Sequence, residues 1–578
     1  MIEEKMEVLN PLRLQRNFLP QQLSFSSWNE IETFFRSLAE REISSTDEFL
    51  KWLEDVNELE SVFSEEMAWR YIRSSINTAD ASAEEAYEFF VSEIEPNASP
   101  WFNRFNQIID ASPFRDQLDP ALYGIFLRSV RNDIAIYREE NIALFTEIDN
   151  LKQQFGKIAG AMSIEHEGKE LTLQQAARLV QSPDRSLREH IWRSIWHRRL
   201  IDREKLDELF DKLCALRQQV AANAGFVNYR DYSFAALGRF DYTPSDCFAF
   251  HDAIADEVVP FLGKLNEHRR QKLELNQLRP WDLDVDPDGK APLHPFSGGS
   301  DLLAKTLECV SAVKPEYAGY LRQMNELGHF DLDSRIGKAP GGYNYPLAES
   351  GVPFIFMNAS GTQNDVTTMV HEAGHAIHSF LMNDLSLNAF RNTPSEVAEL
   401  ASMSMELISM EHWQSFYTSE EDYRRARLRQ LEHTLETLPW VAAVDAFQHW
   451  VYEHPAHSAA ERSQAWKMIY SRFVLPGVNW DGLEPVFANN WQKQLHIFEI
   501  PFYYIEYGMA QLGALAVWRN YRLNPAKGLE GYEQALKLGY TRSIGEIYAA
   551  ASIRFDFSKE YVRELVSFTA NEITALSK

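Results

Sequence analysis

Two histidines about two thirds of the way along the chain have the spacing of metal ligands. His371 and His375 belong to the pattern His-Glu-x-x-His. On a helix, residues four apart project from one face, close enough to share a metal ion. Glu372, next to the first histidine, could take a proton from a metal-bound water without being a ligand itself. The pattern is therefore typical of a zinc site that carries its own base.

The segment around these histidines favours a helix. Residues 361–393 contain no proline, and apolar residues stand beside the polar stripe at helical spacing. A pattern of five residues also arises by chance, so a helix with two hydrogen-bonded histidines and no metal is the alternative interpretation. A third ligand at a suitable position would favour the metal site.

Candidates for the third ligand occur on the next predicted helix. Residues 383–393 indicate a loop, and residues 395–410 then show a long helical pattern. Glu396, Glu399 and Glu406 fall on one face of this helix, among small residues that suit close packing against another helix. Glu399 is the preferred ligand and Glu396 the alternative, while Glu406 is the candidate for a side chain that supports a ligand.

Two further polar residues lie on the predicted zinc helix. His378 shares the face of the two histidines, and we interpret it as a buried residue that makes hydrogen bonds, because catalysis needs an open coordination position. A metzincin would require a glycine at this position and a histidine at Leu381, so that class is excluded. Asp365, near the expected start of the helix, is interpreted as a helix cap.

These motifs resemble those of a known family. Residues 371–375 and 394–406 look like the metal-binding motifs of the M3 metallopeptidases, above all of their oligoendopeptidase F branch. The resemblance covers the chain from about Met162 onward, and the first 150 residues show little of it. It implies a large, mainly α-helical metallopeptidase with two lobes, a deep central channel and a small β-sheet beside the zinc helix. It also implies one Zn²⁺ per chain, with Glu399 as the third ligand.

The resemblance gives roles to residues late in the chain. His496, Tyr504 and Tyr507 match positions that face the zinc in the family, where neutral donors stabilise the negative charge that develops on the scissile carbonyl oxygen. The spacing from His496 to the tyrosines is one residue shorter than in the thimet oligopeptidase branch, so the main donor is left open. By composition alone, this aromatic run would be interpreted as core.

The segment before the zinc motif predicts a small sheet. Residues 338–345 are glycine-rich, and residues 352–358 form a short apolar run between turns. An exposed edge at Gly342 and Tyr343 could hydrogen-bond an extended peptide backbone. Together with Tyr503, these two residues are the predicted substrate contacts. The alternative is a structural hairpin that covers the zinc helix.

Composition and charge exclude several classes of protein. A net charge of −27 argues against nucleic acid or an anionic membrane as partner. No run of about 18 apolar residues occurs, and no secretory signal is visible, so a cytoplasmic protein is expected. Cys214, Cys247 and Cys309 are too few and too scattered for a disulfide framework or a cysteine zinc site. The oligomeric state is left open.

Apolar residues at spacings of three and four predict helices over most of the remaining chain. The clearest patterns cover residues 28–41, 45–60, 83–94, 120–139 and 186–222, and alternation over residues 161–173 predicts one β-hairpin. We place a boundary near residue 185, between an N-terminal helical lobe (1–185) and a catalytic region (186–578).

The predicted function is hydrolysis of internal bonds in short oligopeptides by a zinc-activated water, with Glu372 as general base. A zinc carboxypeptidase of related helical fold would share both motifs but would require a free C-terminus on its substrate. A non-catalytic peptide-binding protein is the second alternative, although it would have no need for Glu372.

Overall fold

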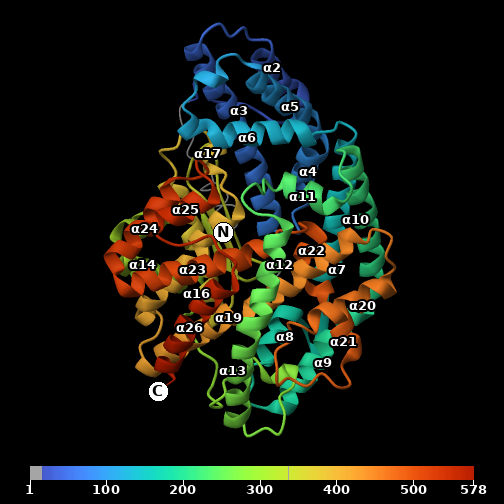
Figure 1. Ribbon diagram of the computed structural model, residues 1–578, viewed down its shortest axis with the longest axis vertical. Coiled ribbons are helices and arrows are strands. Elements are labelled where there is room, and N and C mark those ends of the chain that lie inside the picture. The colour runs from blue at the N-terminus through green and yellow to red at the C-terminus, as the bar shows by residue number, and fades with distance from the viewer. Residues whose placement is uncertain (1–15, 336, 578) are drawn as a thin grey trace. The chain divides into compact units, whose positions relative to one another are not determined.

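Helices form most of the structure (Figure 1). The computed structural model describes residues 16–335 and 337–577. It is 69% helical with few strands, which confirms the prediction of a mainly α protein. None of the helices in these two ranges is both long enough and apolar enough to cross a lipid bilayer.

The chain folds into two compact units, each assembled from three separate segments. Among the described residues, unit 1 comprises those within 16–142, 294–425 and 513–555, and unit 2 those within 143–293, 426–512 and 556–577. The predicted division into residues 1–185 and 186–578 treats the chain as two consecutive pieces. The compact units alternate along the sequence instead, because segments far apart in the chain pack together.

Unit 1 contains the N-terminal helices, a three-stranded sheet and the predicted zinc helix. Its α-helices and strands are α2 (Trp28–Ala39), α3 (Thr46–Ile76), α4 (Ala81–Phe89), α5 (Glu95–Ala111), α6 (Pro120–Ile136), α14 (Gly299–Val313), α15 (Pro315–Glu326), β3 (Phe330–Asp333), β4 (Tyr343–Tyr345), β5 (Phe354–Ala359), α16 (Gln363–Leu381), α17 (Asn388–Arg391), α18 (Ser395–Ser409), α24 (Pro525–Lys537) and α25 (Ile544–Ala550).

Unit 2 contains a hairpin and a second set of helices. Its elements are β1 (Ser163–His166), β2 (Lys169–Thr172), α8 (Leu173–Leu179), α9 (Arg185–Ile201), α10 (Arg203–Asn223), α11 (Tyr229–Ala236), α12 (Pro244–Ala253), α13 (Val259–Lys272), α20 (Ala459–Tyr470), α21 (Glu484–Asn489), α22 (Leu495–Glu499) and α26 (Lys559–Leu576). Three further helices include residues of both units: α7 (Asn141–Gly160), α19 (Glu420–Glu453) and α23 (Ile505–Leu523).

Several predicted elements are present with altered limits. The helix predicted over residues 45–60 continues to Ile76, because buried Val62, Trp69 and Ile72 prolong its apolar face. The single helix predicted over residues 186–222 is wrong, since the chain breaks at Asp202 into α9 and α10. The predicted hairpin is confirmed as β1 and β2.

The sheet of unit 1 leads directly into the zinc helix. Its strand order is β3-β5-β4, with β5 parallel to β3 and antiparallel to β4. The central strand β5 is almost fully buried, as expected for its apolar run, and α16 begins four residues after its end. The sequence analysis did not predict β3. Because β4 is an edge strand, one of its sides is not paired within this sheet.

Candidate active site

The start of α16 is fixed by a reciprocal capping interaction. Thr362 is the N-cap, and its side chain accepts a hydrogen bond from the backbone N–H of Asp365. The carboxylate of Asp365 accepts in return from the backbone N–H groups of Thr362 (2.8 Å) and Ser360 (2.9 Å). Asp365 therefore satisfies donors at the helix start, as a partner of the capping residue rather than as the cap itself.

Close packing of α16 on α18 brings the predicted ligands together. At Gly374, an added Cβ would lie 2.7 Å from the Cα of Ser402 and 3.0 Å from the carbonyl oxygen of Ala401. Only glycine permits this approach of the two backbones. The hydroxyl of Tyr532 also anchors α18, because it donates to the carbonyl oxygen of Ala401 at 2.7 Å.

Three side-chain atoms converge where the two helices meet. The Oε2 of Glu399 lies 3.3 Å from Nε2 of His371 and 3.6 Å from Nε2 of His375. Each of the three residues offers one ligand atom, and these atoms all lie within 4.8 Å of one another. Glu399 is buried, while the two histidine rings are partly exposed. Two imidazoles and one carboxylate form a donor set that suits Zn²⁺ and leaves a coordination position open.

Neighbouring groups hold two of these side chains in place. Oε1 of Glu406 lies 2.7 Å from Nδ1 of His371, and the hydroxyl of Ser402 donates to Oε2 of Glu399 at 2.9 Å. Burial opposes protonation of His371, but the carboxylates of Glu399 and Glu406 outweigh it and raise the pKa of His371 well above its usual value. The sequence analysis did not single out Ser402.

Glu372 lies on the buried side of the same helix turn. Its side chain is buried, and burial raises the pKa of Glu372 to about 7. The side chain of Asn344, in strand β4, donates to the backbone carbonyl of Glu372 at 3.2 Å, which ties the sheet to the zinc helix. A carboxyl group with a pKa near neutrality can both accept and release a proton at physiological pH.

Two residues considered in the sequence lie outside the group of converging atoms. His378 is 2% exposed, and burial lowers its pKa to about 3, so that its imidazole is neutral. Glu396, the alternative ligand, is buried in the first turn of α18, where its backbone carbonyl accepts from Tyr548.

The predicted substrate contacts of unit 1 lie at the edge strand. Gly342 directly precedes β4, and Tyr343 is its first residue. The side chain of Tyr343 is held within unit 1, because its ring stacks on Phe356 and its hydroxyl lies 2.6 Å from Oγ of Ser75. A peptide at this edge would therefore meet the backbone of Tyr343 rather than its side chain.

In unit 2, His496 and the three tyrosines form one cluster around the turn between α22 and α23. The ring centroid of His496 lies 4.9 Å from that of Tyr504, 5.6 Å from that of Tyr507 and 5.8 Å from that of Tyr503. All four side chains are partly exposed. Burial raises the pKa of Tyr504 well above its usual value, so its hydroxyl keeps its proton.

A strained residue shapes this turn. Phe502 has a φ of 68°, a left-handed conformation that is unfavourable for a bulky side chain. The side chain of Gln448 accepts from its N–H at 2.8 Å, and the guanidinium of Arg239 donates to its carbonyl oxygen. Arg239 also pairs with Glu506 in the first turn of α23. The sequence analysis assigned no role to Gln448 or Arg239, because the sequence does not show which distant loop they contact.

Two models of known protein families match consecutive parts of the chain. The family model "Peptidase family M3" matches residues 178–567, and the model "Peptidase M3 N-terminal domain" matches residues 18–137. The chain belongs to peptidase family M3. It is therefore a peptidase. The prediction that the first 150 residues carry little of the resemblance is wrong, because the N-terminal helices have a family model of their own.

Relatives of this M3 peptidase include bacterial oligopeptidases. It is 21% identical over 415 residues to "Oligoendopeptidase F, plasmid" of Lactococcus lactis subsp. cremoris, which covers 71% of this chain and 67% of the relative. It is 29% identical over 179 residues to "Oligopeptidase PepF" of Bacillus subtilis (strain 168), which covers 31% of this chain and 26% of the relative.

Solved structures of the family have the same fold. The structure of "PZ peptidase A with inhibitor 2" matches the M3 peptidase with a TM-score of 0.91 and 28% identity, over 96% of this chain and 98% of that one. A structure described as an oligoendopeptidase F matches with a TM-score of 0.90 and 27% identity, over 97% and 99% of the two chains.

Proposed function

We propose that this M3 peptidase is a zinc-dependent endopeptidase that hydrolyses internal bonds of short oligopeptides. The observation that supports this most strongly is the convergence of His371, His375 and Glu399 on one point beside buried Glu372. The names of the relatives, an oligoendopeptidase F and an oligopeptidase, support the substrate class.

His371, His375 and Glu399 would hold the metal. Bound there, Zn²⁺ would polarise the scissile carbonyl and lower the pKa of a water toward neutrality. His371 needs its Nε2 lone pair for this task, and Glu406 favours the required tautomer by accepting a hydrogen bond from Nδ1–H. Ser402 restrains Glu399, so the carboxylate stays oriented toward both imidazoles.

Glu372 acts as general base and then as general acid. It accepts a proton from the attacking water and delivers it to the amine that leaves. The buried position of Glu372 favours both steps, because it raises the pKa of the carboxyl group to about 7. A carboxylate exposed to water, with a pKa near 4.3, would be a weaker base at neutral pH.

His496, Tyr504 and Tyr507 donate hydrogen bonds to the carbonyl oxygen as negative charge develops on it. Each such donor stabilises the transition state by about 3–4 kcal/mol relative to the ground state. The clustering of these side chains and the raised pKa of Tyr504 support this role, because a donor must keep its proton.

Peptide recognition would use backbone groups more than particular side chains. The edge strand β4 offers its free side at Gly342 and Tyr343, where an extended peptide could add as a further strand. Tyr503 is the third proposed substrate contact. A net charge of −27 favours peptides over nucleic acids as ligands.

An internally quenched peptide with an amidated C-terminus tests this function. We expect cleavage at an internal bond, detected by fluorescence and located by mass spectrometry of the products. A chelator should abolish the cleavage and added Zn²⁺ should restore it. Cleavage only of peptides with a free carboxylate would favour a carboxypeptidase, and binding without hydrolysis would favour a peptide-binding protein.

A further inference from the structure

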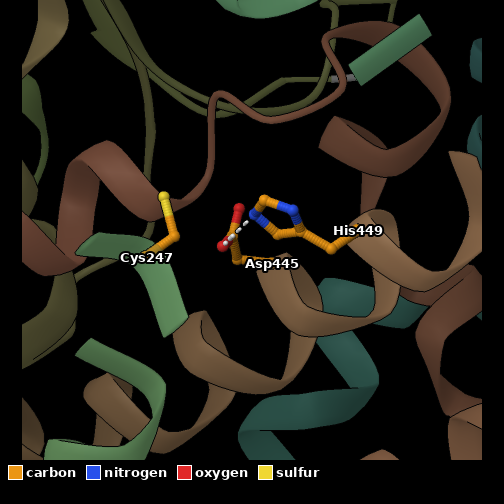
Figure 2. Close-up of side chains that lie close together, drawn as sticks. All are labelled: Cys247, Asp445 and His449. Atoms are coloured by element: carbon orange, nitrogen blue, oxygen red, sulfur yellow. Dashed lines mark ion pairs between the residues drawn. The ribbon is translucent and has the colours of Figure 1, made fainter. Parts of the chain in front are cut away.

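A second group of potential metal ligands lies in unit 2. Figure 2 shows that the side chains of Cys247, on α12, and of Asp445 and His449, on α19, lie close together. Each offers one ligand atom, and the three atoms lie within 4.8 Å of one another. All three residues are at most 2% exposed. None of them belongs to the proposed peptidase site.

The arrangement of these residues follows from helical spacing. Asp445 and His449 are four residues apart on α19, so they share one face of that helix. Cys247 and His251 have the same spacing on α12. Side chains that project inward from facing helices can enclose a metal ion, as in helical bundles with metal sites.

Asp445 and His449 have buried polar atoms that no hydrogen bond uses within the described part of the chain. Nε2 of His251 lies 2.8 Å from Oδ2 of Asp445, and it holds the carboxylate by that oxygen. Within the described part of the chain, Oδ1 of Asp445 and both ring nitrogens of His449 have no hydrogen-bond partner. His449 Nε2 is 3.3 Å from Asp445 Oδ2, but the contact lacks the alignment of a hydrogen bond. Buried polar atoms without a partner are rare in native proteins and need an explanation.

We propose that Cys247, Asp445 and His449 form a second metal site, which takes Zn²⁺ or a similar divalent transition metal. A thiolate, an imidazole and a carboxylate are the donors that zinc prefers, whereas calcium and magnesium select oxygen alone. His251 serves as the supporting residue, because its contact with Oδ2 holds the carboxylate of Asp445 in place beside the imidazole of His449. The metal would provide a partner for the carboxylate of Asp445 and for one ring nitrogen of His449, and it would link α12 to α19.

Aromatic rings border one side of the proposed site, and a surface hollow lies beside it. The ring of His449 packs against Phe234, Phe248 and Phe502, which keep one side apolar. His251 and His449 also line a surface hollow of about 270 Å³. Of the three proposed ligands, His449 lines this hollow and Cys247 and Asp445 do not, so an ion would approach the group from the side of His449.

Cobalt substitution distinguishes the two sites, because only the second contains sulfur. We choose the full-length His371→Ala/His375→Ala variant, in which the first site is destroyed. Titrated with Co²⁺, this variant should bind one ion and develop the near-ultraviolet charge-transfer absorption of a cobalt–thiolate bond. Adding Cys247→Ser should remove this absorption, while adding Cys214→Ser, a matched change in the same unit, should keep it. If no thiolate absorption develops in the His371→Ala/His375→Ala variant, the second site is overturned.

Thermal unfolding provides a readout that does not depend on absorption. Because a metal that binds only the folded state stabilises it, Zn²⁺ should raise the Tm of the His371→Ala/His375→Ala variant by several degrees. The same addition should leave the Tm unchanged once Cys247→Ser is also present, with circular dichroism verifying that this protein is folded. Equal shifts in both proteins would overturn the proposal. Peptidase activity is measured in neither experiment, so the proposed function can fail while this site stands.

Discussion

Gly374 packs directly against Ser402, so closely that an added Cβ would lie 2.7 Å from the Cα of Ser402. The glycine lies between the two proposed zinc ligands of α16, and Ser402 lies one turn after Glu399 on α18. The contact therefore sets the distance between the helices at the level of the site. It explains why a glycine occurs inside a helix, where it is otherwise unfavourable by about 1 kcal/mol.

We predict that Gly374→Ala weakens both stability and zinc binding. The methyl group would push α18 away and with it Oε2 of Glu399, which now lies 3.3 Å from His371. Overpacking of this kind typically costs about 1–3 kcal/mol. Urea unfolding of the metal-free protein would measure the stability, and competition with a zinc chelator would measure the affinity.

Gly319→Ala is the matched control for that experiment. Gly319 lies within α15 of the same unit, and an added Cβ there would meet no atom within 4 Å. This change should leave zinc affinity unaltered and stabilise the protein by up to about 1 kcal/mol, because alanine is the better helix former. If the two variants behave alike, the close contact at Gly374 does not position Glu399.

Glu406 offers a second test of how the site is held. Its Oε1 lies 2.7 Å from Nδ1 of His371. We expect Glu406→Ala to lower zinc affinity by about 10–100-fold, as is typical when the partner of a metal-binding histidine is removed. Glu406→Gln should lose less, because the amide oxygen can still accept a hydrogen bond from Nδ1–H of His371. Zinc affinities equal to that of the unaltered protein in both variants would contradict this role.

Features that depend on the spacing of neighbouring residues could be predicted from the sequence. The helical spacing of His371 and His375 and the strand character of residues 352–358 follow from neighbouring residues alone. Small residues near Glu399 and Glu396 indicated that this face of α18 packs closely against another helix. The distance from Glu399 to His371 depends on the contact at Gly374 and on the rotation of α18 about its axis, which the sequence does not show. The break at Asp202 was missed, because apolar spacing continues through it.

Contacts between residues far apart in the chain could not be predicted from the sequence alone. Cys247 and Asp445 are far apart in the chain, and their types alone suggest nothing in common. Only the packing of α12 beside α19 brings them together. For the same reason, the alternating segments of the two compact units could not be predicted, because the units are defined by contacts between residues far apart in the chain.

Glu372→Gln separates metal binding from proton transfer. The amide has the shape of the carboxyl group but cannot take a proton from water. We expect zinc content to be retained and kcat to fall by at least about 100-fold, the lower range for removal of a general base. Metal analysis and steady-state cleavage of the quenched peptide would measure the two quantities. Substantial turnover in this variant would remove Glu372 from its proposed role.

The tyrosine cluster can be tested by removing single hydroxyl groups. Tyr504→Phe and Tyr507→Phe should lower kcat without loss of zinc, and the main donor should show a decrease of about 100–1,000-fold. Tyr503→Phe is the comparison, since its ring also lies beside His496 but its proposed contact is with the substrate. It should change KM more than kcat. Unchanged kcat in both the Tyr504 and Tyr507 variants would contradict the proposed stabilisation.

The burial of His329 indicates that acid destabilises unit 1. The side chain is 0% exposed, its Nδ1 lies 3.1 Å from the carbonyl oxygens of Val352 and Pro353, and its ring packs against Trp69 and Phe354. Burial lowers the pKa of His329 below 6.5. The unfolded chain therefore binds a proton at His329 more readily than the folded protein does.

It follows that the free energy of unfolding decreases as the pH falls from 6.5 toward the pKa of His329 in the folded protein. Above pH 6.5 His329 is neutral in both states, so it causes no such decrease there. One proton of difference corresponds to a slope of at most about 1.4 kcal/mol per pH unit. His329→Asn keeps an N–H donor but cannot titrate, so its stability should fall less steeply between pH 6.5 and 5, even if it is lower at pH 8. Urea unfolding midpoints of both metal-free proteins across this range give the comparison. The other histidines are present in both proteins and contribute equally to both curves of stability against pH. Parallel curves would therefore contradict the prediction, because they would mean that the folded protein protonates His329 as readily as the unfolded chain does.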